Sequence, residues 1–447
     1  MKKRNIVIIS VLAVVCIALA VVLFIFSRNN PVKTQQTTQS ATETTTAAAT
    51  EAQVADISLA LSEYRAFLQW KAEEGAAGYN VYFDSGNGYE IYGKAKTNAF
   101  RSKGLKGGTS YTFGIKSYTL EGDKEVEAAD FLYTIKGNTL PDTPQVKVTK
   151  KNNIYTLEWR KVNNASEYIV YSMLPGDTEW TREGVTNQRG FEFEKAKTPK
   201  LFIAVRAVRH ADGQKYVSDY VKTYVSDEKP AGKMYSCGDS IATGVGSHSY
   251  SYANIFAEEN NLTLVNKATT GSQLSSENAG KDHICENIIK DVNGDYDYLF
   301  IEGGNNDYYF NAKPGKVTPA GTKEFDMNTT CGALEAAFTH LKENSPETKV
   351  IFILIHNAGG RATTENGIGF TFNDYAKGIR EVCKKYGISV ADCLKDSGFD
   401  TVSPKVSNQY THKFNGVFPS GDGVHPTEEA YRKFYMPLIY NFVPCKL

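Results

Sequence analysis

Three residues of this 447-residue chain have the types and spacing of a nucleophilic hydrolase site. Ser240 follows the short stretch 233–237 and opens a glycine-rich turn, and His425 lies far downstream with Asp422 three residues before it. A serine hydroxyl attacks only when a base takes its proton, and a histidine oriented by a carboxylate suits this task near neutral pH. Gly423 permits the chain to turn so that Asp422 can meet the imidazole.

The elements that must position these residues alternate between buried strands and helices. Short apolar runs and helical patterns predict strands at 262–265, 298–301, 350–355 and 388–390, and helices at 253–259, 332–344, 372–386 and 427–442. This alternation predicts an α/β domain over 232–447 whose parallel sheet is covered by helices on both faces. Ser240, Gly271 and Asn306 each follow a strand, at the carboxyl edge where such sheets gather their sites.

Residues 232–447 resemble the SGNH, or GDSL-type, hydrolase family. The resemblance rests on a Gly-Asp-Ser motif ending at Ser240, a Gly-x-Asn-Asp motif that contains Asn306, and an Asp-x-x-His motif ending at His425. It implies a flavodoxin-like three-layer α/β/α fold and ester hydrolysis, with Ser240 as nucleophile, His425 as general base and Asp422 as its orienting carboxylate. It further implies an oxyanion hole formed by the backbone N–H groups of Ser240 and Gly271 and the side-chain amide of Asn306.

Two aromatic residues follow the asparagine motif. Tyr308 and Tyr309 are candidate substrate contacts, because an aromatic wall can stack on a sugar ring or an acyl chain. Aromatic residues after a strand are as often part of the core. Tyr308 and Tyr309 are therefore expected either to contact the substrate or to belong to the core.

No metal site and no cofactor are predicted. A calcium-like run begins at Asp291 and reaches Glu302, but Tyr296 stands where the sharp turn of such a loop requires glycine. None of the cysteines shows CxxC spacing. Buried free thiols in a large core are the favoured interpretation of the six C-terminal cysteines, and disulfides, which export would permit, are the alternative.

The N-terminus predicts a membrane partner. Lys2, Lys3 and Arg4 precede an apolar run over 6–26, 21 residues long, which as a helix would span about 31 Å. The basic flank should stay in the cytoplasm, so 1–30 is expected to be a signal-anchor of a single-pass protein whose remaining part is extracellular. The alternative is a cleaved signal peptide, and cleavage after Ala20 would leave an apolar stub. The threonine-rich segment 31–55 is predicted to be a flexible linker.

An internal repeat fills the region between linker and α/β domain. Residues 56–138 and 141–227 each contain period-two strands with Gly-Asp or Asp-Gly turns, which indicate antiparallel hairpins. The two segments resemble fibronectin type III modules, with Trp70 and Trp159 as core tryptophans and Tyr111 as a tyrosine-corner residue that the second copy lacks. The modules are expected to be spacers or to contact a cell-wall glycan.

The bulk composition gives no sign of a nucleic-acid partner. Lys and Arg together number 50, as do Asp and Glu, and no basic stripe stands out. Family habit and the exported, tethered layout favour a serine esterase that removes acyl groups, acetyl above all, from a carbohydrate or cell-wall polymer. The alternatives are a lipase, lysophospholipase or thioesterase, and a non-catalytic surface protein that binds glycans.

Overall fold

The computed structural model of the protein describes residues 50–54, 56–196, 198–418 and 420–442. The predicted anchor at 1–30 and most of the predicted linker lie outside these residues. Within the described ranges, no helix combines the length and the apolar character needed to cross a membrane.

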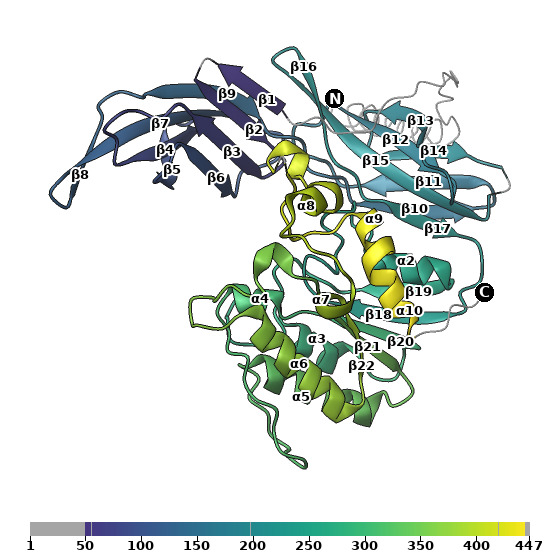
Figure 1. The fold of residues 1–447 in the computed structure, drawn as a ribbon. Helices are drawn as coiled ribbons and strands as arrows, with labels where there is room; N and C mark the ends of the chain where they lie inside the picture. The colour runs from purple at the N-terminus through teal and green to yellow at the C-terminus, as the bar shows by residue number, and fades with distance from the viewer. Residues whose placement is uncertain (1–49, 55, 197, 419, 443–447) are drawn as a thin grey trace, which may run out of the picture. The chain divides into compact units, whose positions relative to one another are not determined.

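The first all-β region is a sandwich of two antiparallel sheets (Figure 1). One sheet has the order β1 (Thr50–Val54), β2 (Ile57–Leu61), β3 (Arg65–Trp70) and β6 (Ala99–Lys103). The other has the order β5 (Glu90–Ala95), β4 (Gly78–Asp84), β7 (Ser110–Glu121) and β8 (Lys124–Glu127), with β9 (Tyr133–Asn138) also paired to β7. Alternate side chains of both sheets, Leu68, Trp70, Val81 and Ile115 among them, fill the core between them.

Strand β1 corrects the predicted linker boundary. It lies inside the segment 31–55, and it pairs antiparallel with β2 along its whole length. Main-chain hydrogen bonds form a β-ladder whatever the side chains are, so a polar, threonine-rich composition did not prevent this segment from adding an edge strand.

The second all-β region repeats the architecture. One sheet has the order β10 (Val146–Lys151), β11 (Ile154–Trp159) and β14 (Gly190–Glu194). The other contains β13 (Thr181–Thr186), β12 (Glu167–Met173), β15 (Lys200–Ala211) and β16 (Gln214–Val217), with β17 (Thr223–Ser226) on β15. The predicted tyrosine corner is present in the first region only, where the Lys106 N–H donates to the Tyr111 hydroxyl over 2.9 Å. In the second region Leu201 is a buried core residue.

The C-terminal region has a five-stranded, all-parallel sheet, as predicted. Its order is β19 (Leu262–Asn266), β18 (Gly232–Cys237), β20 (Tyr298–Glu302), β21 (Lys349–Leu354) and β22 (Ser389–Asp392). This order, 2-1-3-4-5 in sequence, is that of flavodoxin-like sheets. The order reverses next to β18, so the loop that follows β18 lies at the topological switch point.

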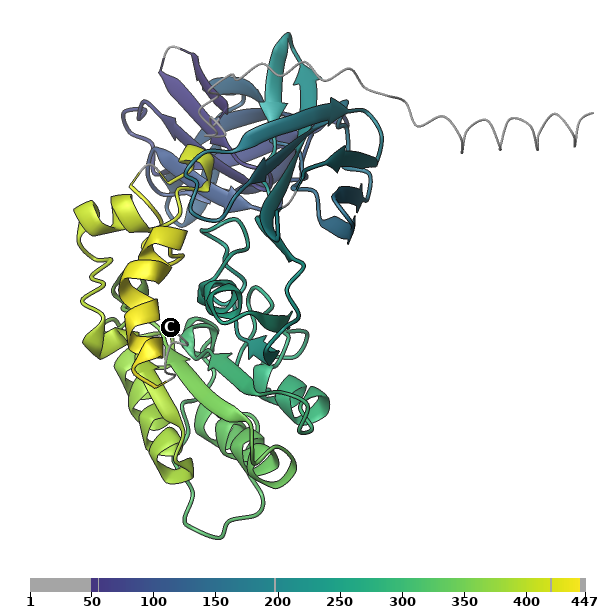
Figure 2. The ribbon, with the colours of Figure 1, turned by 90° about the vertical axis from the view of Figure 1, so that its right-hand side faces the viewer.

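Helices cover both faces of this sheet (Figures 1 and 2). On one face lie α2 (Tyr252–Glu259) and the C-terminal helical run α9 (Glu428–Ala430), η3 (Tyr431–Tyr435) and α10 (Met436–Tyr440); on the other lie α3 (Ile284–Asp291), α5 (Thr330–Asn344) and α6 (Phe372–Tyr386). The short helices α4 (Asn305–Tyr309), α7 (Cys393–Asp396) and α8 (Pro404–Tyr410) lie in the connections. Helix α3 takes up Asp291, so the calcium-like run is divided between a helix and β20.

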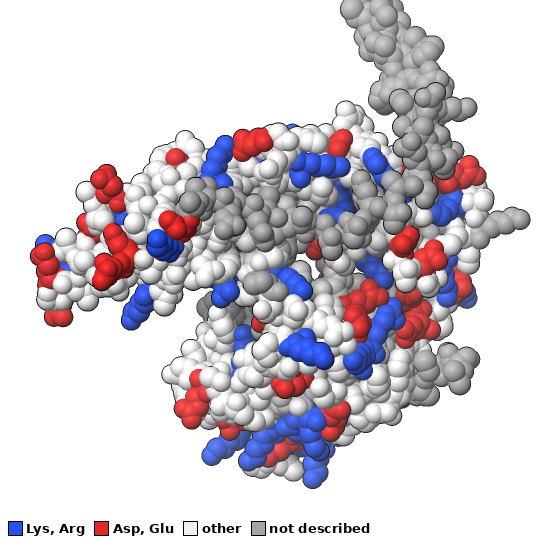
Figure 3. All heavy atoms as spheres, turned by 45° about the horizontal axis from the view of Figure 1, so that its top comes forward, with Lys and Arg blue, Asp and Glu red and all other residues white. Residues whose placement is uncertain are grey.

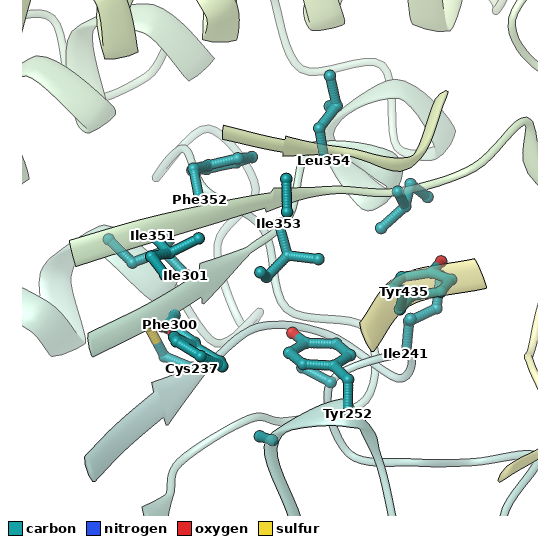
Figure 4. Close-up of a cluster of buried hydrophobic side chains, with 14 of the residues drawn as sticks. Cys237, Ile241, Tyr252, Phe300, Ile301, Ile351, Phe352, Ile353, Leu354 and Tyr435 are labelled. Carbon is teal, nitrogen blue, oxygen red and sulfur yellow. Dashed lines mark hydrogen bonds between the residues drawn. The ribbon is translucent and has the colours of Figure 1, made fainter. Parts of the chain in front are cut away.

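The sheet core is apolar and closely packed (Figure 4). Ile351, Phe352, Ile353 and Leu354 of β21 are fully buried, and they pack with residues of β20 and of the covering helices such as Tyr435. The cysteines that the structure describes are buried free thiols. Burial raises the pKa of Cys237 well above its ordinary value, so this thiol stays neutral and serves as a core residue.

Charged side chains are intermixed on the surface. On the face shown in Figure 3, acidic and basic residues lie among one another over both the β-sandwiches and the α/β region. This matches the equal totals of the two signs in the sequence.

Candidate active site

Ser240 lies in the turn that follows β18 at the switch point of the sheet. The turn is fixed locally, because the Asp239 carboxylate accepts from the Ile241 N–H over 2.8 Å and the Ser240 carbonyl accepts from the Val245 N–H over 3.1 Å. Gly246 lets this turn touch the histidine segment, since a Cβ there would lie 2.7 Å from the His425 carbonyl oxygen. The glycine-rich sequence after Ser240 therefore serves close approach rather than mobility.

The structure brings the three residues of the predicted triad together. His425 Nε2 lies 2.8 Å from Ser240 Oγ, and His425 Nδ1 lies 2.5 Å from Asp422 Oδ2. The other Asp422 oxygen accepts from the N–H groups of Val424 and His425, each over 2.9 Å. Burial alone would raise the pKa of Asp422, but the hydrogen bonds and charge of His425 outweigh it and hold the pKa below its ordinary value. Asp422 is thus an ionised carboxylate that orients the imidazole.

A neighbouring segment supports the Asp422–His425 turn through its backbone. The His412 N–H donates to the His425 carbonyl, and the Asp422 N–H donates to the His412 carbonyl, each over 2.9 Å. Burial lowers the pKa of His412 to about 4, so this second histidine is neutral at physiological pH. An antiparallel bridge between Thr411 and Pro426 also joins the His412 segment to the His425 segment.

Two of the three predicted oxyanion donors are backbone N–H groups, those of Ser240 and Gly271. Neither the Ser240 N–H nor the Gly271 N–H donates to another group within the described part of the chain, so both are free for a substrate oxygen. Gly271 has a φ of +88°, which L side chains rarely adopt, and open space surrounds the position of a Cβ. Glycine is therefore needed here for its backbone conformation.

The side-chain amide of Asn306 already makes hydrogen bonds within the protein. Its Nδ2 donates to Asp239 Oδ2 and to the Ser272 carbonyl, each over 3.0 Å. Both amide hydrogens are therefore engaged, and an oxyanion would have to replace one of these acceptors or share a hydrogen with it. The role of Asn306 as an oxyanion donor stays a prediction.

A second buried carboxyl lies behind the nucleophile turn. Glu302, at the end of β20, accepts from the Asp239 N–H over 3.0 Å and is fully buried. Burial, and then the negative charge of Asp239, raise the pKa of Glu302 well above its ordinary value. Two buried carboxyls this close cannot both ionise at low cost, so Glu302 keeps its proton and the pair carries a single charge.

Replacing Glu302 by glutamine is expected to leave kcat/KM within about threefold of wild type, because the amide resembles the protonated carboxyl. The folded protein holds a proton that the unfolded chain releases above its pKa of 4.5. The stabilisation is therefore complete below pH 4.5 and is lost as the pH rises toward the folded pKa. Denaturant unfolding between pH 5 and 8 should show the unfolding free energy of the variant rising relative to that of wild type as the pH rises, by at most about 1.4 kcal/mol for each pH unit. If the difference in unfolding free energy between the variant and wild type does not change with pH, Glu302 is ionised in the folded protein.

The two predicted substrate tyrosines have different environments. Tyr308 is buried, its hydroxyl donates to the Thr364 carbonyl over 3.0 Å, and its ring packs on Phe372, so it is a core residue and not a substrate contact. Tyr309 is 56% exposed, and the Arg361 guanidinium carbon lies 5.2 Å from its ring centroid. Consecutive residues of a helix point about 100° apart, which is why one ring enters the core and the next does not.

Sequence reasoning missed Arg361, which lies in the loop after β21. Its Nη1 donates to Asn305 Oδ1 over 2.5 Å, beside Asn306. The same loop is tied to the histidine segment, because the Gly359 N–H donates to the Gly423 carbonyl over 2.8 Å. Burial lowers the pKa of Arg361 below its ordinary value, yet the guanidinium remains a cation in this neighbourhood. No motif surrounds Arg361 in the sequence, so only its place in the fold identifies it.

One family model and several solved structures match parts of this chain. Residues 236–433 match the model of the GDSL-like lipase/acylhydrolase family. Among solved structures, a protein from Lactobacillus plantarum is 23% identical with a TM-score of 0.41, over 49% of this chain and 100% of that one. Phospholipase A1 from Streptomyces albidoflavus NA297 is 15% identical, with a TM-score of 0.31 over 48% of this chain and 100% of its own. A two-domain fibronectin type III segment of chicken tenascin is 16% identical, with a TM-score of 0.26 over 38% of this chain and 97% of its own. No curated protein matches the chain.

Proposed function

Because residues 236–433 form a GDSL-like lipase/acylhydrolase domain, we propose that the protein is an extracytoplasmic serine esterase that removes short acyl groups, acetyl above all, from a carbohydrate or cell-wall polymer. The observation that carries the proposal is the hydrogen-bonded chain from Ser240 through His425 to Asp422, with distances of 2.8 and 2.5 Å.

The geometry suits a two-step acyl transfer. Ser240 Oγ attacks the ester carbonyl carbon while His425 Nε2 takes the hydroxyl proton, and the carbonyl oxygen becomes an oxyanion facing the N–H groups of Ser240 and Gly271. The intermediate collapses, the C–O bond to the alcohol breaks, and His425 gives its proton to the departing oxygen. Water then attacks the acyl-serine, His425 takes its proton, and the carboxylic acid leaves with Ser240 restored. Asp422 remains ionised throughout and stabilises the imidazolium.

The groups beside the triad support a carbohydrate as the alcohol part. Arg361 has five N–H donors, of which one is engaged by Asn305, and Tyr309 offers an exposed ring. Hydroxyl groups of a sugar accept from a guanidinium, and the apolar face of a sugar stacks on an aromatic ring. The predicted membrane span over 6–26 supports an extracellular polymer as substrate, since it would tether the enzyme at the cell surface.

A chain-length series tests this proposal. We expect the full-length protein in detergent to hydrolyse 4-nitrophenyl acetate with a kcat/KM at least about tenfold above that for the decanoate, and to release acetate from acetylated xylan, chitin fragments or peptidoglycan. Preference for the decanoate would instead favour the lipase or thioesterase alternative. Equal activity of wild type and Ser240→Ala would mean that another group is the nucleophile, whereas a wild type that hydrolyses none of these esters would leave a non-catalytic, glycan-binding role.

A further inference from the structure

We propose that the two β-sandwiches are positioning elements of the active site, in which Arg65 of the first and Lys222 of the second hold the segment that carries Asp422 and His425. This inference rests on the proposed function, because it assigns to the sandwiches a part in the same reaction. The described residues, which lie between 50 and 442, belong to one compact unit, so both sandwiches are part of the body that contains the site.

The first observation is a strained aromatic residue against the catalytic histidine. Phe414 begins the 3-10 turn η2 (Phe414–Gly416), and its φ of 45° lies in the left-handed region that bulky residues rarely adopt. Its ring meets the His425 ring edge-on, with 5.9 Å between centroids and an interplanar angle of 85°. Such a conformation is strained, and it persists only where the surroundings enforce it.

The surroundings that enforce it come from the first sandwich. The Arg65 guanidinium carbon lies 4.2 Å from the centroid of the Phe414 ring, and the Tyr64 ring packs on it edge-on at 6.3 Å. Ala60 of β2 is buried in the same cluster, together with Val417. The β2–β3 hairpin thereby encloses Phe414, which is only 3% exposed, and presses it toward His425.

The second sandwich holds the other end of the catalytic segment. Lys222 follows shortly after β16, and its Nζ donates to both carboxylate oxygens of Glu428, over 2.8 and 3.0 Å. Glu428 is the first residue of α9, three residues after His425. The Lys222 ammonium is buried between the rings of Phe202 and Tyr250, at 4.2 and 4.4 Å. The Lys222 side chain is 8% exposed and the Glu428 side chain 28%, and Glu428 also pairs with Arg432 over 3.0 Å. Lys222 is therefore the buried partner of this ion pair, and its two flanking rings fix its position at the start of α9.

The catalytic turn is thus fixed from outside the α/β region at both ends. Phe414 lies before Asp422 and Glu428 lies after His425, and the His412 backbone joins the Phe414 side to the catalytic turn. A hydrogen bond between nucleophile and base tolerates little displacement, and a misplacement of about 1 Å can cost about 100-fold in rate. Loss of either sandwich contact should therefore lower kcat while leaving substrate binding almost unchanged.

A double-mutant cycle in the full-length protein tests the first contact. We expect Arg65→Ala to lower kcat for 4-nitrophenyl acetate about tenfold with KM within about twofold, and Arg65→Lys to restore part of the loss through the retained charge. Adding Arg65→Ala to Phe414→Leu should cost little more than Phe414→Leu alone, because both changes break the same contact. The matched control is Lys94→Ala, whose ion pair with Glu125 and cation–π contact with Tyr118 lie wholly within the first sandwich. This control should leave kcat unchanged.

The second contact has its own pair of variants. Lys222→Met is expected to lower kcat about tenfold with little change in KM. Lys195→Met, which breaks an ion pair with Glu183 inside the second sandwich, should not lower it. All rates are referred to the fraction of protein that a fluorophosphonate labels, so misfolded molecules do not count.

The outcomes separate this inference from the proposed function. If Arg65→Ala and Lys222→Met retain wild-type kcat, lose activity only through KM, or fall no further than their controls, the sandwiches do not position the site. The same holds if the Arg65 and Phe414 effects simply add. If wild type neither hydrolyses esters nor reacts with the fluorophosphonate, the proposed function itself is wrong. The labelling rate of each variant gives this second readout without any natural substrate.

Discussion

Replacing Ser240 by alanine is expected to lower kcat for 4-nitrophenyl acetate by about 10⁴-fold or more. The variant lacks the hydroxyl oxygen that His425 activates. In wild type His425 Nε2 lies 2.8 Å from Ser240 Oγ, which is within the range for transfer of the hydroxyl proton. Steady-state rates of wild type and variant, purified identically, measure the loss. The free N–H groups of Ser240 and Gly271 remain, so a small residual rate above the uncatalysed reaction is expected.

The matched control for this substitution is Ser85→Ala. Ser85 is an exposed serine in a turn of the first sandwich, and its loss should not change kcat. If Ser240→Ala retained more than about 1% of the wild-type rate, another group would have to be the nucleophile.

Replacing Asp422 by asparagine is expected to lower kcat by about 10²–10⁴-fold with a small change in KM. The Asp422 Oδ1 accepts from two backbone N–H groups, so an asparagine would keep its carbonyl oxygen there and turn its NH₂ toward His425 Nδ1. The imidazole would then carry its proton on Nε2 and could not accept the proton of Ser240. Steady-state kinetics at constant pH measure the effect.

Asp400→Asn is the control for this prediction. Asp400 is exposed, and its Oδ1 accepts from the N–H of Val402 two residues on, as Asp422 Oδ1 does from Val424. The control therefore reproduces the local turn without the histidine, and its kcat should equal that of wild type. A wild-type kcat for Asp422→Asn would show that the carboxylate does not set the tautomer of His425.

The α/β region and its triad could be predicted because their signals are local. The apolar run predicted as a strand over 298–301 is β20, and the run over 350–355 is β21 shifted by one residue. Buried parallel strands are continuous apolar runs, and strand order then brings the loops after them to one edge. Ser240, Asp422 and His425 also stand in short motifs, so their roles were open to inference before their distances were known.

The remaining features depend on partners that are distant in sequence. Arg65 precedes Phe414 by most of the chain, and no periodicity relates an arginine of a β-hairpin to a ring beside a catalytic histidine. The positive φ of Phe414 could not be predicted from the sequence either, because it results from tertiary contacts that override the local preference of the residue. Glu302 looked like the last residue of a calcium loop, and only the fold places it against Asp239. Tyr308 and Tyr309 are adjacent residues of the same type, and only their positions on helix α4 make one buried and the other exposed.

The proposed mechanism requires that Ser240 is a nucleophile activated by His425. Intact-protein mass spectrometry after reaction with a fluorophosphonate tests it most directly, because the serine oxygen displaces fluoride and keeps the phosphonyl group. We expect one adduct per chain, located by peptide mapping at Ser240, absent in Ser240→Ala, and formed at least about 100-fold more slowly in His425→Ala. An adduct on another residue, or equal labelling of wild type and His425→Ala, would contradict it.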